Sequence, residues 1–169
     1  PVTVEDIRAL FEAMIFLERD ALFLAARRIT EERIELLRET HEALKQAMEG
    51  RDYLKVTLEN SRFHRLVYDA VENRFITSYL NHLQNQAQRL AFLSYSRDMA
   101  PDDLASHFHR VLGDHARIIE LLSARDQEGL VQKITEHVQL FHSRVIRYMS
   151  PPLEDMEPLS MPGDMALDG

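Results

Sequence analysis

Apolar residues recur every three or four positions along most of the chain, a spacing that places them on one face of an α-helix. Residues 5–29 show this spacing in its longest form, at Ile7, Leu10, Phe11, Met14, Leu17, Ala21 and Leu24. The opposite face of the same stretch is mostly charged or polar. The pattern therefore predicts a long amphipathic helix whose apolar face packs against other helices.

Capping residues and chain breakers divide the rest of the pattern into five further predicted helices. Thr30 and Asp52 are favourable N-caps, and Gly50 lies where the second helix should stop. Asp126 is a third candidate cap, for the last helix. The predicted helices after the first cover residues 31–48, 53–71, 74–97, 101–124 and 127–149.

Short connections between long helices make consecutive helices antiparallel neighbours. The fold expected for residues 1–150 is therefore one all-α domain, an antiparallel bundle of about six to seven helices. Only five Gly and six Pro are present, which agrees with long helices. Residues 151–169 are rich in Pro, Met and acidic side chains without a helical period, so we expect a flexible C-terminal tail.

Composition narrows the classes of function. The 169 residues carry a net charge of −8, which argues against this chain binding nucleic acid by itself. The chain contains no Cys, so a metal site would have to use His, carboxylate or amide ligands. No apolar run is long enough for a membrane span, and no signal peptide is visible. Because Pro1 rather than Met opens the chain, we expect a further segment upstream.

Three of the eight histidines lie on apolar stripes of three different predicted helices. His64 follows Asn60 by four positions, so the two side chains share a face. His115 and His137 stand among Ile, Leu, Val and Phe residues of their own helices. One divalent cation would satisfy several buried imidazole nitrogens at once, whereas separate hydrogen bonds to neighbours would satisfy them one by one. The pattern alone leaves both interpretations open.

The other five histidines fall mostly off the apolar stripes or near helix ends, and a surface or structural role is expected for each. They are His41, His82, His107, His109 and His142.

Four segments, in this order, resemble the FCD (FadR C-terminal) domain of GntR-type bacterial transcription regulators. They are LFEAMIFLERDALFLAARRIT (10–30), LENSRFHRLVYDAVENRF (58–75), DHARIIELLSARDQEGL (114–130) and EHV (136–138). The resemblance extends over residues 5–148. It implies a helical bundle that follows a winged-helix DNA-binding domain, a domain not contained in this chain.

The resemblance also implies a site and partners. Many such domains hold a divalent metal through an Asp or Asn and three His, which correspond here to Asn60, His64, His115 and His137. Nitrogen-rich ligation favours a transition metal, most of all Zn or Ni. The implied partners are a small-molecule effector, typically a carboxylate bound beside the metal, and a second copy in a homodimer. Operator DNA would be bound only through the winged helix, in the cytoplasm.

Two positions depart from the family pattern. Asn60 replaces a frequent Asp, which removes a negative charge and leaves the cation for an anionic effector to compensate. Met14 stands where an Arg is frequent, which suggests a less acidic or more apolar effector. Arg89, with Asn85 on the same predicted helix, is the remaining candidate for contact with an anion.

Two alternatives to a metal-dependent sensor remain. An enzyme could use three His and a metal to activate water, but these motifs offer no acid–base partner, no Glu-x-x-His pair and no Gly-rich phosphate loop, so we do not predict an enzyme. A metal-free helical interaction module would satisfy each histidine separately.

Overall fold

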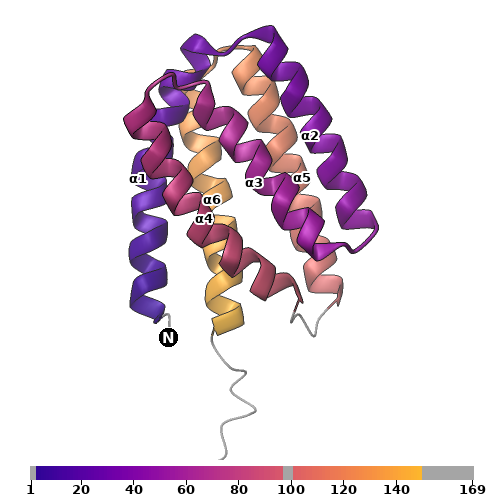
Figure 1. Ribbon diagram of the computed structural model, residues 1–169. Helices are drawn as coiled ribbons and strands as arrows, with labels where there is room; N and C mark the ends of the chain where they lie inside the picture. The colour runs from indigo at the N-terminus through magenta and orange to yellow at the C-terminus, as the bar shows by residue number, and fades with distance from the viewer. Residues whose placement is uncertain (1–2, 97–100, 150–169) are drawn as a thin grey trace, which may run out of the picture.

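The computed structural model describes residues 3–96 and 101–149 and builds them into an all-α bundle of six helices, as predicted (Figure 1). The helices are α1 (Val4–Arg28), α2 (Glu31–Glu49), α3 (Tyr53–Asp69), α4 (Arg74–Ser96), α5 (Pro101–Ser123) and α6 (Gln127–Met149). In Figure 1, α2 and α3 run side by side on one side of the bundle, and α1 lies with α6 on the other. The expected tail, residues 151–169, lies outside the described residues.

Side-chain N-caps define the beginnings of three helices, and two of them, Thr30 and Asp52, were predicted. Thr3 and Asp6 form a reciprocal capping box at the start of α1. The side chain of Thr30 accepts a hydrogen bond from the Arg33 backbone, and Asp52 accepts one from Lys55. These bonds satisfy backbone N–H groups that have no partner inside the helix.

The helix ends are less simple than predicted. Gly50 caps α2 in an ordinary right-handed conformation (φ −77°), and Arg51 takes the left-handed one (φ 53°). Helix α3 ends at Asp69, two residues earlier than expected, because the chain turns back through Glu72 (φ 50°). In both places a non-glycine residue carries the positive φ of the turn, which the sequence pattern does not reveal.

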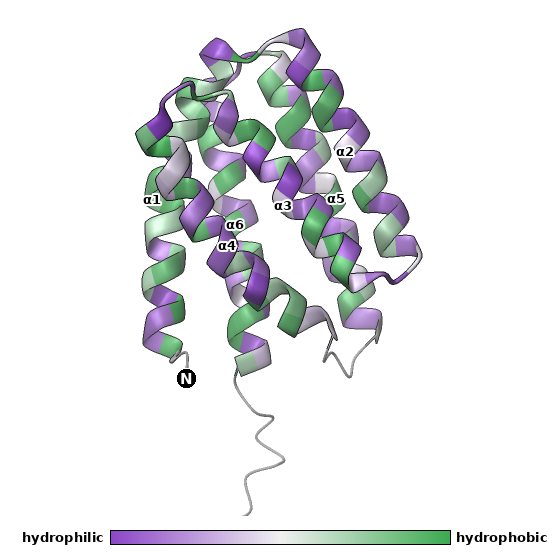
Figure 2. Cartoon of the chain, in the orientation of Figure 1, coloured by the Kyte–Doolittle hydropathy of each residue, from purple (hydrophilic) through white to green (hydrophobic). Residues whose placement is uncertain are grey.

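Hydrophobic and hydrophilic residues alternate along each helix (Figure 2), and the apolar faces meet in two adjoining clusters. The larger cluster joins all six described helices around fully buried side chains such as Phe11, Tyr68 and Leu122. The smaller one joins α2, α3, α4 and α5 around Leu44 and Val56. None of the six described helices combines the length and the hydropathy required to span a bilayer.

The turn between α5 and α6 is tied to the end of α1 by Arg125. Its guanidinium donates hydrogen bonds to the backbone oxygens of Ala26, Arg27 and Ile29, at 3.1, 2.9 and 3.1 Å. The last carbonyls of a helix lack partners inside it, so these bonds act as a cap supplied from another element. The tie fixes the relative positions of α1, α5 and α6, three of the helices that surround the site described next.

Candidate metal centre and adjoining cavity

The three histidines that the sequence placed on separate helices meet in the interior of the bundle. His64 comes from α3, His115 from α5 and His137 from α6, and one ring nitrogen from each lies within 4.8 Å of the other two. The exposed fractions of the three side chains are 5%, 0% and 5%. The structure therefore brings these three predicted residues together at one place.

Hydrogen bonding fixes the orientation of His137. Its Nδ1 lies 3.2 Å from Asp114 Oδ2, and the other oxygen of Asp114 accepts from Lys133 Nζ at 3.2 Å. A carboxylate in this position assigns the ring proton to Nδ1 and leaves the Nε2 lone pair available. Nε2 of His137 faces Nε2 of His115 at 3.3 Å. A carboxylate behind an imidazole is the arrangement that orients histidine ligands in metal sites.

His115 has the most restricted surroundings of the three. Its ring stacks on Phe63 with a centroid distance of 4.0 Å and an interplanar angle of 4°. Its Nδ1 is buried and has no hydrogen-bond partner among the described residues. A buried nitrogen without a hydrogen-bond partner lowers the stability of the fold. A cation bound to a nitrogen of this ring would change the hydrogen bonding that the ring requires.

Burial keeps His64 and His115 in their neutral, metal-binding form. Burial, together with the neighbouring His137, lowers the pKa of His64 to about 3. Burial also lowers the pKa of His115 well below its usual range, with smaller contributions from His137, His64 and His41. Imidazole binds metals through a lone pair, so rings that resist protonation at neutral pH are suited to this role.

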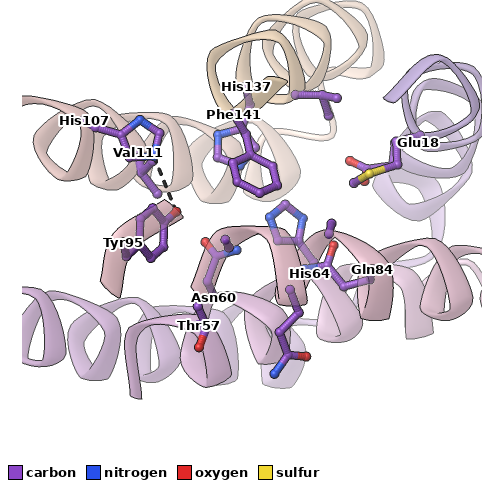
Figure 3. Close-up of a pocket in the computed structure, with 15 residues that line it drawn as sticks. Glu18, Thr57, Asn60, His64, Gln84, Tyr95, His107, Val111, His137 and Phe141 are labelled. Carbon is purple, nitrogen blue, oxygen red and sulfur yellow. Dashed lines mark hydrogen bonds between the residues drawn. The ribbon is translucent and has the colours of Figure 1, made fainter. Parts of the chain in front are cut away.

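Asn60 lies one turn before His64 on α3, and both side chains line one cavity with His137 (Figure 3). Asn60 is half-buried, so its amide can reach both the cavity and the surface. The donor set of three imidazoles and one amide oxygen fits a transition metal such as Zn or Ni better than Mg or Ca.

The cavity beside the histidines has a volume of about 30 Å³, enough for one or two water molecules. Its walls come from α1, α3, α4, α5 and α6, so a ligand there would touch five of the six described helices. A metabolite fits only if lining side chains move. The lining includes Met14 but neither Lys nor Arg.

One end of the cavity is polar in a way that the sequence pattern does not reveal. Glu18 on α1 is fully buried, and its Oε1 accepts a hydrogen bond of 2.7 Å from the hydroxyl of Tyr68. Gln84 lies 3.4 Å from the same hydroxyl and donates to Ser61. Burial raises the pKa of Glu18 to about 7, and the bond from Tyr68 offsets part of this effect.

The other end of the cavity contains His107, which was expected in a surface or structural role and is 2% exposed. Its Nε2 lies 3.4 Å from the hydroxyl of Tyr95. The spacing from Leu104 to His107, Phe108 and Val111 puts all four on one helical face. That signal was present in the sequence. Of the remaining four histidines, His82 and His109 are exposed, and His41 and His142 are half-buried.

The two residues proposed from sequence to meet an anionic effector do not lie at this cavity. Arg89 lines a separate groove between α1 and α4, and Asn85 accepts a hydrogen bond of 2.6 Å from Arg65. The phase of α4 explains the difference, because Gln84 and Ala87 face the cavity and positions 85 and 89 point elsewhere.

Fold and site together define an all-helical domain built around a buried histidine cluster. The FCD domain family matches residues 9–140, most of the chain, and the protein therefore belongs to that family. Confirmation of the predicted family also agrees with the expectation of a regulatory domain rather than an enzyme.

Individual relatives are similar at lower identity. The chain is 24% identical over 137 residues to the uncharacterized HTH-type transcriptional regulator YdhC of Bacillus subtilis (strain 168), covering 80% of this chain and 58% of that protein. The fold resembles Escherichia coli McbR/YncC, with a TM-score of 0.78, 20% identity and coverage of 88% of this chain and 68% of the other. It also resembles Streptococcus agalactiae GntR, with a TM-score of 0.66, 22% identity and coverage of 81% and 58%.

Replacing Asp114 by Asn should weaken metal binding. The amide lacks the negative charge that holds the Nδ1 proton of His137, and loss of such a partner typically lowers metal affinity by about 10- to 100-fold. Competition with a chromophoric chelator measures the dissociation constant for Zn. Asp103→Asn on the same helix, where Asp103 pairs with Arg147 at the surface, is the matched control. Equal affinities for the two variants would contradict the role assigned to Asp114.

Replacing Glu18 by Gln should remove a pH dependence of stability. The pKa of Glu18 rises from 4.5 to about 7 on folding, so its contribution is fully present below pH 4.5 and is lost as the pH rises through 7. Relative to wild type, Glu18→Gln should therefore gain stability between acidic and weakly alkaline pH, by roughly 3 kcal/mol.

Urea unfolding of metal-free protein at several pH values measures this difference, in which the histidine contributions cancel. The exposed Glu12 on the same helix provides the control, Glu12→Gln. A stability difference that does not change with pH would show that Glu18 is not a buried acid.

Proposed function

We propose that this chain is the effector-sensing, metal-binding and dimerising half of a GntR-type transcription regulator. His64, His115 and His137 would hold a divalent transition metal, Zn or Ni, with Asn60 as a fourth ligand. The observation that carries the proposal is the convergence of three buried imidazoles from three helices, each with a ring nitrogen within 4.8 Å of the other two. A bound metal supplies a Lewis-acidic position to which an effector oxygen can bind.

Charge favours a carboxylate at that position. Three neutral imidazoles and an amide leave the charge of the cation uncompensated, and the cavity lining contains no Lys or Arg that could bind an anion instead. A carboxylate beside the metal would supply the missing negative charge, so effector binding and metal binding should support one another.

In this proposal, effector binding alters DNA binding by changing the relative positions of the helices. A metal held by α3, α5 and α6 links three helices, and an effector in the small cavity must displace side chains that belong to five. A ligand that binds one helix arrangement more tightly than another shifts the equilibrium between the two. In the proposed regulator, a winged-helix domain outside this chain reads that shift as a change in operator binding.

Exposed apolar side chains offer a contact surface for the proposed homodimer. Large apolar side chains stand exposed on the neighbouring helices α1 and α4, among them Phe16 (72%), Phe75 (64%) and Tyr79 (65%). Leu54 and Leu58 on α3 are exposed as well, and exposed large apolar side chains of this kind are available for a protein interface. The net charge of −8 leaves operator contact to the other domain.

The test uses the longer protein that includes the DNA-binding domain. Its affinity for DNA selected in vitro is measured after chelation, after return of Zn or Ni, and with a series of small carboxylates. We expect the metal-loaded protein to change its DNA affinity with at least one carboxylate, and His64→Ala to lose that response. The exposed His82 provides the control, His82→Ala. A carboxylate that binds this domain but leaves DNA affinity unchanged would contradict the sensing function.

A further inference from the structure

The cavity has a second chemical feature besides the histidines, an acid with a free oxygen. Glu18 enters from α1, whereas Asn60 and His64 enter from α3 (Figure 3). Oε1 of Glu18 is occupied by the Tyr68 hydroxyl, but Oε2 is buried and has no hydrogen-bond partner among the described residues. A fully buried carboxyl oxygen without a partner leaves a hydrogen-bonding group unsatisfied at the cavity wall.

No basic side chain among the described residues that line the cavity reaches this oxygen. The residues that line the cavity include neither Lys nor Arg, and Met14, one turn before Glu18 on the same face of α1, is apolar. The described residues form no ion pair with Glu18 closer than 4 Å. A cation or donor for Oε2 must therefore come from the occupant of the cavity.

We propose that the effector is a compact amino-carboxylate whose ammonium group binds Glu18 Oε2 while its carboxylate binds at the metal. This inference rests on the proposed function, since it names the class of ligand for the same cavity. The two ends of such a ligand carry opposite charges, and so do the two walls of a metal-loaded cavity. A dipolar ligand is neutral overall, so its burial leaves neither wall with an uncompensated charge.

An ammonium fits this wall better than a hydroxyl group does. Burial raises the pKa of Glu18 to about 7, so near neutral pH the carboxyl group loses its proton to solvent when a bound cation stabilises the carboxylate. A hydrogen bond between ionised partners is roughly twice as strong as one between neutral groups. The small volume of the cavity favours short ligands such as α- and β-amino acids.

The experiment compares matched ligands on the Zn-loaded chain. Calorimetric titration uses alanine and β-alanine against propionate, and aspartate against succinate, and metal content is measured after each titration to exclude removal of Zn by the amino acid. We expect at least one amine-bearing member to bind about tenfold or more tightly than its deaminated partner. The preference should disappear in Glu18→Gln and persist in Glu12→Gln, whereas the deaminated acid should bind all three proteins equally.

A second variant keeps the test valid if Glu18→Gln does not fold. Met14→Lys places a cation one turn before Glu18, where it can occupy Oε2, and should also abolish the preference for the amine. Carboxylates that bind metal-loaded protein without preference for an amine would overturn this inference and leave the proposed function standing. Binding of neither series would overturn the inference, and the operator experiment would then decide the proposed function by itself.

Discussion

Three imidazole rings brought into one buried region of a helical bundle impose a constraint that the surrounding residues must meet. Two Nε2 atoms face each other at 3.3 Å, and His115 Nδ1 has no partner among the described residues. Protonation would add a charge in a region that burial makes unfavourable to charge, as the lowered pKa values of His64 and His115 indicate. A metal site requires deprotonated imidazole nitrogens that lie close together, and burial favours this form in His64 and His115.

The surrounding residues support this arrangement from outside. Asp114 orients His137, and Lys133 neutralises Asp114 on the partly exposed side of the cluster. Phe63 holds the His115 ring flat against its own face. The Arg125 tie to the end of α1 fixes the α5–α6 turn. The DHARIIELLSARD segment thus combines His115 of the cluster, the acid that orients His137 and the residue that anchors the turn, which is a physical reason for these residues to occur together.

The sequence predicted the fold class, the number of helices and the three core histidines because each leaves a local signal. Amphipathic spacing and N-caps mark a helix, and a polar residue on an apolar stripe marks a buried polar group. The residues missed were those whose role depends on contacts between helices. Glu18 is one, because its burial depends on Tyr68 and Gln84 from two other helices. The location of Arg89 outside the cavity depends on how α4 is rotated, which spacing alone does not give.

The most direct test of the account is the metal itself. Elemental analysis and X-ray absorption on the chain purified without an affinity metal would measure its content and coordination. The account predicts near-stoichiometric Zn or Ni with mainly nitrogen ligands, a melting temperature that falls on chelation, and loss of both in His115→Ala but not in His82→Ala. Absence of metal, with a melting temperature indifferent to chelator and to added Zn or Ni, would contradict it and identify the domain as a metal-free helical bundle.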